Sequence, residues 1–156
     1  GFYRQDQVIG PLDPPRPDGF YGLSKVFGEN LAQLYWDRHR IETVSLRIGS
    51  SFAEPKDRRM LATWMSFDDT ERLIVAALTA PVVGHSVIYG LSDNATVFWD
   101  NTSASHIGYR PQDSSEKHRA AVEARQPTID TTQLAARCQG GAFVTQGPFF
   151  DSSEET

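Results

Sequence analysis

The feature that most constrains the fold is a regular alternation of helical and strand patterns between residues 21 and 91. Apolar residues at helical spacing run from residue 21 to about 39, and the β-branched stretch 42–48 (E-T-V-S-L-R-I) follows as a strand. A capping box at 66–69 opens a second helix to about residue 80, and 86–91 (S-V-I-Y-G-L) is typical of a second strand. Because a helix connects the two strands, they are expected to be parallel. The alternation predicts an α/β fold.

Two strands are too few to complete such a fold, and both are of the buried type that needs neighbours on each side. A Pro-rich surface loop is expected over 1–18, and a short helix over 60–65. In the second helix, four apolar residues are expected to face inward: Leu73, Ile74, Ala77 and Leu78. The sequence therefore predicts the C-terminal part of a larger parallel sheet.

Charge and composition exclude several classes of function. Fifteen basic and 20 acidic residues give a net charge of −5, which argues against nucleic acid or an anionic membrane as the main partner. The longest apolar run, 73–78, is far too short to span a bilayer, and no signal peptide is recognisable, although the chain does not begin with Met. The single Cys138 excludes an internal disulfide framework and fits a cytoplasmic setting. The four histidines lack metal-ligand spacing, so no metal site is expected.

Tyr21 and Lys25 form the sharpest chemical signal. Residues four apart lie on one face of a helix, about one turn from each other. An ammonium group beside a phenol favours the phenolate, which can take a proton from an alcohol. The same spacing also fits a helix start followed by a solvated lysine, so spacing alone leaves both interpretations open.

The surroundings of this pair resemble the extended short-chain dehydrogenase/reductase family. Its hallmark is Tyr-x-x-x-Lys at the start of a long helix, followed by a strand ending in L-R-x-G-x, here 46–50 (L-R-I-G-S). Within that family, four blocks between residue 1 and about 151 are similar to the uronate dehydrogenases: 16–30 (RPDGFYGLSKVFGEN), 47–55 (RIGSSFAEP), 59–64 (RMLATW) and 140–143 (GGAF). The resemblance implies a Rossmann-type doubly wound parallel sheet with helices on both faces. It also implies NAD as cofactor and oxidation of a hexuronic acid, glucuronate or galacturonate, at C1 to the aldarolactone.

The resemblance also assigns roles. It makes Tyr21 the general base, assisted by Lys25, which also binds the nicotinamide ribose, and it places Ile48 against the nicotinamide. Three residues are implied in substrate binding: Ser50 through its hydroxyl, Arg59 through the carboxylate, and Phe143 as a cover. A guanidinium fork suits a carboxylate because it makes a bidentate, charge-assisted pair. On sequence alone Arg59 also fits a surface patch with Arg58, Ser50 a strand end, and Phe143 ordinary core.

Parts of the family pattern are missing from these residues. The glycine-rich turn that seats the pyrophosphate does not occur, and the family's catalytic Ser would fall just before Gly1. We therefore expect 1–156 to be the C-terminal portion of a single NAD-binding domain, with substrate segments at about 50–66 and 95–150, and to be inactive alone. The family also implies a homo-oligomer. Two alternatives stay open: a nucleotide-sugar epimerase or dehydratase of the same family, and a non-catalytic fragment or cofactor-sensing relative.

Overall fold

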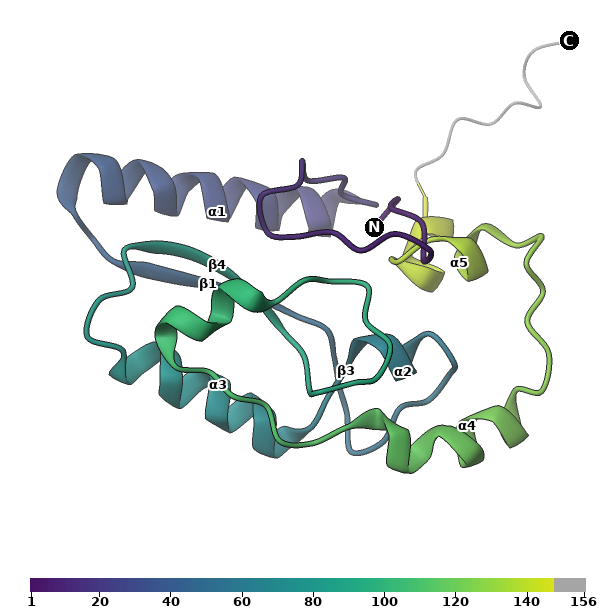
Figure 1. Cartoon of the computed structure of the whole chain (residues 1–156). Coiled ribbons are helices and arrows are strands. Elements are labelled where there is room, and N and C mark those ends of the chain that lie inside the picture. The colour runs from purple at the N-terminus through teal and green to yellow at the C-terminus, as the bar shows by residue number, and fades with distance from the viewer. Residues whose placement is uncertain (148–156) are drawn as a thin grey trace, which may run out of the picture.

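The computed structural model describes residues 1–147, which form helices packed on a short parallel sheet (Figure 1). The helices and strands follow in this order: α1 (Phe20–His39), β1 (Thr43–Ile48), β2 (Ser50–Ser51), α2 (Met60–Thr63), β3 (Trp64–Met65), α3 (Phe67–Thr79), β4 (His85–Gly90), α4 (Arg119–Arg125) and α5 (Leu134–Arg137). Short 3₁₀ helices span Thr102–Ile107 (η1), Ser115–His118 (η2) and Gly141–Thr145 (η3). None of the described helices has the length and apolar character needed to cross a membrane.

The predicted parallel pairing is confirmed. β1 and β4 run parallel, with Thr43 opposite His85 at one end and Ile48 opposite Gly90 at the other. β2 and β3 form a second, two-residue parallel pair. In Figure 1 the helix α1 lies on one side of these strands and α3 on the other, as a doubly wound sheet requires.

The two faces of the sheet follow from the alternation of side chains along each strand. On the α3 face, Ile88 is fully buried in a core with Met65 and Leu73, and Val44 and Leu46 of β1 pack against it. On the α1 face, Arg47 reaches Glu29 of the helix. The sheet is therefore apolar toward α3 and carries an ion pair toward α1.

The inward positions predicted for α3 are partly wrong. Leu73 is fully buried, but Ile74 is 43% exposed and Leu78 is 79% exposed. Both line an open apolar depression with Val44 and Leu46 of β1. Within residues 1–147, β4 is the only strand paired with β1. The side of α3 that carries Ile74 and Leu78 therefore has no further strand beneath it among the described residues.

Other boundaries differ by a few residues. The helix expected over 60–65 ends at Thr63, because Trp64 and Met65 turn extended and pair with β2. Half of the capping box is confirmed, since the Ser66 hydroxyl accepts a hydrogen bond from the Asp69 amide. The Ser66 amide donates to the Ser92 hydroxyl instead of to the Asp69 carboxylate. The end of the expected 95–150 segment lies beyond residue 147, outside the described residues.

Candidate active site

Tyr21 and Lys25 lie in the first turns of α1, where the chain leaves the N-terminal loop. The helix is preceded by Gly19 in extended conformation, and the Lys25 ammonium lies 5.0 Å from the centre of the Tyr21 ring. The Tyr21 side chain is 74% exposed, so its hydroxyl is accessible to a substrate. The structure thus places the phenol and the ammonium together on an open face of the helix.

The end of β1 lies at the carboxyl edge of the sheet, where open α/β folds bind ligands. Ile48 is 45% exposed there. The next residue must be glycine, because the Thr63 carbonyl oxygen occupies the space of any Cβ at Gly49. Ser50 follows, buried, with its Oγ 2.9 Å from the Thr63 Oγ1. The close approach of α2 therefore fixes the strand end and orients the Ser50 hydroxyl.

Arg59 precedes α2 and is held from the C-terminal segment. Its Nε donates a hydrogen bond of 2.5 Å to the Gln139 carbonyl. Burial lowers the pKa of the Arg59 guanidinium below its usual value, although nearby Asp57 and Asp18 act in the opposite direction. Within residues 1–147, no carboxylate lies at ion-pair distance from this side chain. A partly desolvated cation without an anionic partner is a natural binding site for an acidic ligand.

Phe143 lies in η3, close to the Arg59 contact. It is 57% exposed, and its amide bonds to the carbonyl of Gly140. Gly140 itself lies against Asp18, just ahead of α1, so the C-terminal segment spans from the start of α1 to Arg59. Figure 1 shows α5 and the start of α1 toward the same end of the molecule.

The structure thus groups the expected residues in three places. Tyr21 and Lys25 form one pair, Arg59 bonds to the C-terminal segment that also carries Phe143, and Ser50 joins α2 through Thr63. In the described part of the chain, no hydrogen bond links Tyr21 or Lys25 to the other groups. The Asp18 carboxylate, just ahead of α1, lies near enough to Arg59 to act on the pKa of its guanidinium, which it raises.

Sequence reasoning missed Gln139, which is 3% exposed and joins several segments. Its side-chain amide donates to the carbonyls of Arg4 and Gln7 and accepts from the Trp99 indole. A lone glutamine before two glycines carries no recognisable signal. It became visible only when the fold brought the N-terminal loop beside the C-terminal segment.

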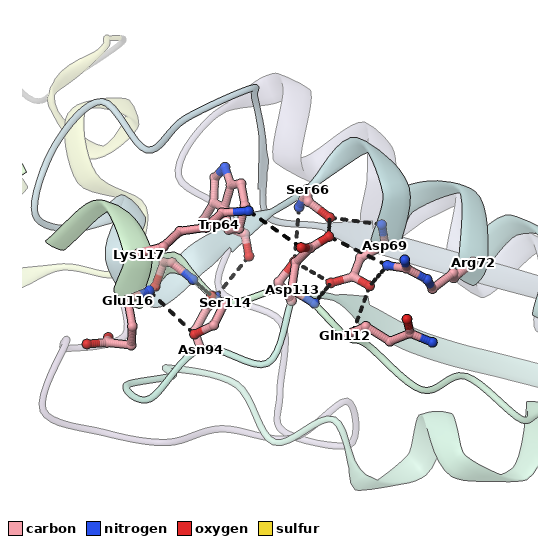
Figure 2. Close-up of polar contacts among 12 residues, drawn as sticks. Trp64, Ser66, Asp69, Arg72, Asn94, Gln112, Asp113, Ser114, Glu116 and Lys117 are labelled. Atoms are coloured by element: carbon pink, nitrogen blue, oxygen red, sulfur yellow. Dashed lines mark hydrogen bonds and ion pairs between the residues drawn. The ribbon is translucent and has the colours of Figure 1, made fainter.

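A second missed feature is the buried carboxylate of Asp69, drawn in Figure 2. It accepts hydrogen bonds from the Arg72 guanidinium, the Ser92 hydroxyl and the backbone amides of Gln112 and Asp113. The network holds the segment after β4 against the start of α3. Because these hydrogen bonds leave the Asp69 carboxylate fully paired, we assign Asp69 a structural role.

Within residues 1–147, no group of three or more His, Cys, Asp or Glu residues could hold a metal ion. The residues expected from the sequence carry a phenol, an ammonium, a hydroxyl and a guanidinium. A Rossmann-type α/β fold with Tyr-x-x-x-Lys opening the helix before such a strand end defines a short-chain dehydrogenase/reductase.

Comparison with known proteins shows which members of this class the chain is similar to. The chain is 57% identical over 151 residues to uronate dehydrogenase of Pseudomonas syringae pv. tomato. The alignment covers 97% of this chain and 54% of that protein. The crystal structure of glucuronic acid dehydrogenase from Chromohalobacter salexigens superposes with a TM-score of 0.91 at 48% identity, over 94% of this chain and 55% of that one. A mutant uronate dehydrogenase from Agrobacterium tumefaciens complexed with NAD gives a TM-score of 0.91 at 43% identity, over 97% and 57%. No family model matches the chain.

Over nearly its whole length the chain is therefore similar to uronate dehydrogenases. It spans about 55% of the length of the relatives it matches, which fits the C-terminal portion expected from the sequence. The Rossmann-type fold implied by the resemblance is confirmed by the solved relatives.

Proposed function

We propose that this chain contributes the catalytic Tyr–Lys pair and most substrate contacts of an NAD-dependent uronate dehydrogenase. The reaction would oxidise glucuronate or galacturonate at C1 to the aldarolactone. The observation that carries this proposal is Arg59, a partly buried guanidinium without a carboxylate partner in the described residues, near the start of the helix that bears Tyr21. A uronate needs both groups, because its carboxylate on C5 and its anomeric hydroxyl on C1 are separate groups on the two ring carbons that flank the ring oxygen.

The proton-transfer step falls to Tyr21. Its phenolate takes the proton of the C1 hydroxyl, and Lys25, whose ammonium lies 5.0 Å from the ring centre, stabilises that phenolate. The C1–O bond becomes a carbonyl, and because the ring oxygen stays attached to C1 the product is a lactone.

The residues present fit the cofactor. The exposed apolar side chain of Ile48 offers a surface for a nicotinamide ring, and Lys25 can bond a ribose hydroxyl. Bound NAD would accept the hydrogen that leaves C1 with its bonding electron pair. The short-chain relative solved with NAD supports this choice of cofactor.

Three residues are proposed to hold the sugar. Arg59 would bind the carboxylate through its two Nη groups, since its Nε is already bonded to Gln139. Ser50 would bond a sugar hydroxyl, because a serine oxygen engaged with Thr63 keeps further bonding capacity. Phe143, largely exposed in η3, would cover the sugar.

We also propose the wider setting. Residues 1–156 would form the C-terminal portion of one NAD-binding domain, with substrate segments at about 50–66 and 95–150. The exposed apolar residues Phe27 and Leu31 of α1 suit self-association into a homo-oligomer, and the free, buried Cys138 suits the cytoplasm.

The proposal is tested by NADH absorbance with the full polypeptide that carries this sequence. Glucuronate and galacturonate should support NAD reduction, whereas glucose and galactose, which lack the carboxylate, should be poor substrates. Turnover of a nucleotide-linked sugar without net NAD reduction would instead identify an epimerase and overturn the proposal.

A further inference from the structure

Arg59 is held from two sides by the C-terminal segment, and both contacts come from the backbone of that segment. The Gln139 carbonyl accepts the Arg59 Nε–H at 2.5 Å. Two residues later Gly141 adopts φ +60°, and a Cβ at that position would lie 2.6 Å from the Arg59 Cδ and 2.8 Å from its Nε. The guanidinium thus lies directly on a bare glycine.

This arrangement determines which edge of the guanidinium is free. Because the Nε–H is occupied by the Gln139 carbonyl, the bidentate edge that includes Nε is not available to a ligand. Within residues 1–147 neither Nη group donates a hydrogen bond to the protein, so the edge formed by the two Nη groups is left for a carboxylate. The orientation of that edge depends on where the Gln139 carbonyl points.

The position of the Gln139 carbonyl is in turn fixed by the hydrogen bonds that the Gln139 side chain makes. The side-chain amide donates to the carbonyls of Arg4 and Gln7 at 2.9 and 2.8 Å, and the Trp99 Nε1–H donates to its oxygen at 2.9 Å. Trp99 stacks on Tyr89 of β4, with ring centres 5.1 Å apart. The position of Arg59 is therefore tied to the sheet through Gln139 and Trp99.

We infer that Gly141 and Gln139 are positioning residues for Arg59, and that they set the preference for a carboxylate-bearing sugar over a neutral one. This inference rests on the proposed function, because it needs Arg59 to bind the substrate carboxylate. Gly141 provides the space in which the side chain lies, and Gln139 selects the edge that it presents.

The test compares two glycines that share backbone strain but differ in contact. Gly141 and Gly108 both have positive φ, +60° and +82°, but a Cβ at Gly108 meets nothing within 4 Å. Gly141→Ala and Gly108→Ala therefore impose similar strain, and only Gly141→Ala displaces Arg59. In the full polypeptide, kcat/KM is measured for glucuronate and for glucose.

We expect Gly141→Ala to lower kcat/KM for glucuronate on the order of 10- to 100-fold, with the loss mainly in KM, and to leave glucose nearly unchanged. Gly108→Ala should leave the glucuronate-to-glucose ratio at its original value. An equal loss on both sugars in Gly141→Ala, or the same ratio change in Gly108→Ala, would overturn the inference.

If Gly141→Ala does not fold, the milder variant Trp99→Phe tests the same inference. Trp99→Phe keeps an aromatic ring beside Tyr89 but removes the indole donor to Gln139, together with part of the ring volume. It should lower the glucuronate-to-glucose ratio about 2- to 10-fold, the worth of one hydrogen bond. An unchanged ratio would count against the inference.

Arg59→Ala distinguishes a failure of the proposed function from a failure of the positioning inference. If it leaves the glucuronate-to-glucose ratio unchanged, the carboxylate contact and with it the proposed function fail. If Arg59→Ala abolishes the preference while Gly141→Ala and Trp99→Phe keep it, the proposed function stands and only the positioning inference fails.

Discussion

Arg47 of β1 and Glu29 of α1 form a bidentate ion pair, in which the Nε and Nη2 of the arginine each lie 2.8 Å from a carboxylate oxygen. Both side chains are largely buried, and the remaining Nη1 donates to the Tyr89 hydroxyl of β4. Glu29 follows Lys25 by one helical turn. The pair therefore fixes the helix that carries Tyr21 and Lys25 to the strand that ends at Ile48.

Loss of this pair is expected to reduce stability clearly. Glu29→Ala would leave the Arg47 guanidinium without its main partner in a partly buried place, at a cost of about 1.5–3 kcal/mol in the free energy of unfolding. Urea denaturation of the full polypeptide measures this cost. The Glu29→Ala/Arg47→Ala double variant isolates the coupling between the two side chains.

The matched control is the ion pair of Arg4 and Asp6, which is also bonded through two guanidinium nitrogens but is more than 60% exposed on both sides. Asp6→Ala should change the free energy of unfolding far less than Glu29→Ala does, because exposed pairs contribute little. Similar losses in Glu29→Ala and Asp6→Ala would show that burial of the first pair is unimportant.

Tyr21→Phe is expected to remove turnover while leaving NAD affinity largely intact. General base catalysis contributes about 10² to 10⁴-fold in rate, and the phenylalanine keeps the ring but has no hydroxyl. NADH absorbance gives the rate and calorimetry the NAD affinity. Tyr35→Phe on the same helix removes a second exposed hydroxyl and should keep full activity. A Tyr21→Phe enzyme that turns over as fast as Tyr35→Phe would contradict the assignment of the base.

Arg59→Lys should keep the positive charge but lose most of the uronate preference. A lysine has no planar fork and cannot place two donors on a carboxylate while a third bonds the Gln139 carbonyl. We expect kcat/KM for glucuronate to fall roughly 10- to 150-fold, as for the loss of a charge-assisted hydrogen bond. Glucose should be affected much less. Arg58→Lys is the control, because Arg58 bonds instead to Gln126.

Asp113 gives a prediction about pH. The Ser66 hydroxyl, which donates a 2.6 Å hydrogen bond, and the nearby Lys117 and Arg72 hold the pKa of Asp113 below its usual value. A carboxyl whose pKa is lowered in the folded state stabilises the fold above its unfolded-state pKa of about 3.9, and this stabilisation is lost as the pH falls through the lower folded-state pKa. Asp113→Asn should therefore be less stable than the natural protein at neutral pH, and the difference should shrink below about pH 4.

NMR titration of Asp113 separates the contributions to this shift. Ser66→Ala removes its largest cause and should move the pKa of Asp113 upward more than Lys117→Met does, because the ammonium is exposed and 3.5 Å away. The reverse order would mean that the exposed charge, rather than the hydroxyl, controls Asp113.

The elements that local pattern controls were predicted well from the sequence. The helix that begins near Tyr21, the strand that ends at Ile48 and the cap at Ser66 all depend on residues close together in the chain. Their periodicity and capping chemistry are readable without knowledge of the rest of the fold. The parallel pairing followed from the helix between the two strands.

The contacts that could not be predicted join distant segments. Gln139 bonds to Arg4 and Gln7 across more than 130 residues, and Glu29 meets Arg47 only after the chain turns back. The position of Ile74 could not be predicted either, because helical periodicity shows an apolar face but not whether a strand lies beneath it. Burial of such residues is decided by tertiary packing.

The last prediction concerns residues 1–156 expressed alone. These residues hold no glycine-rich turn to seat a pyrophosphate, β1 has a paired strand on one edge only in the described part, and Ile74 and Leu78 lie exposed beside it. We expect the isolated polypeptide to self-associate, and to show neither tight NAD binding by calorimetry nor NADH formation with glucuronate. Leu78→Lys should reduce self-association in light scattering, whereas Leu12→Lys, at a 98% exposed site in the N-terminal loop, should not. Tight NAD binding or clear turnover by the isolated 156 residues would show that the cofactor site needs no further segment.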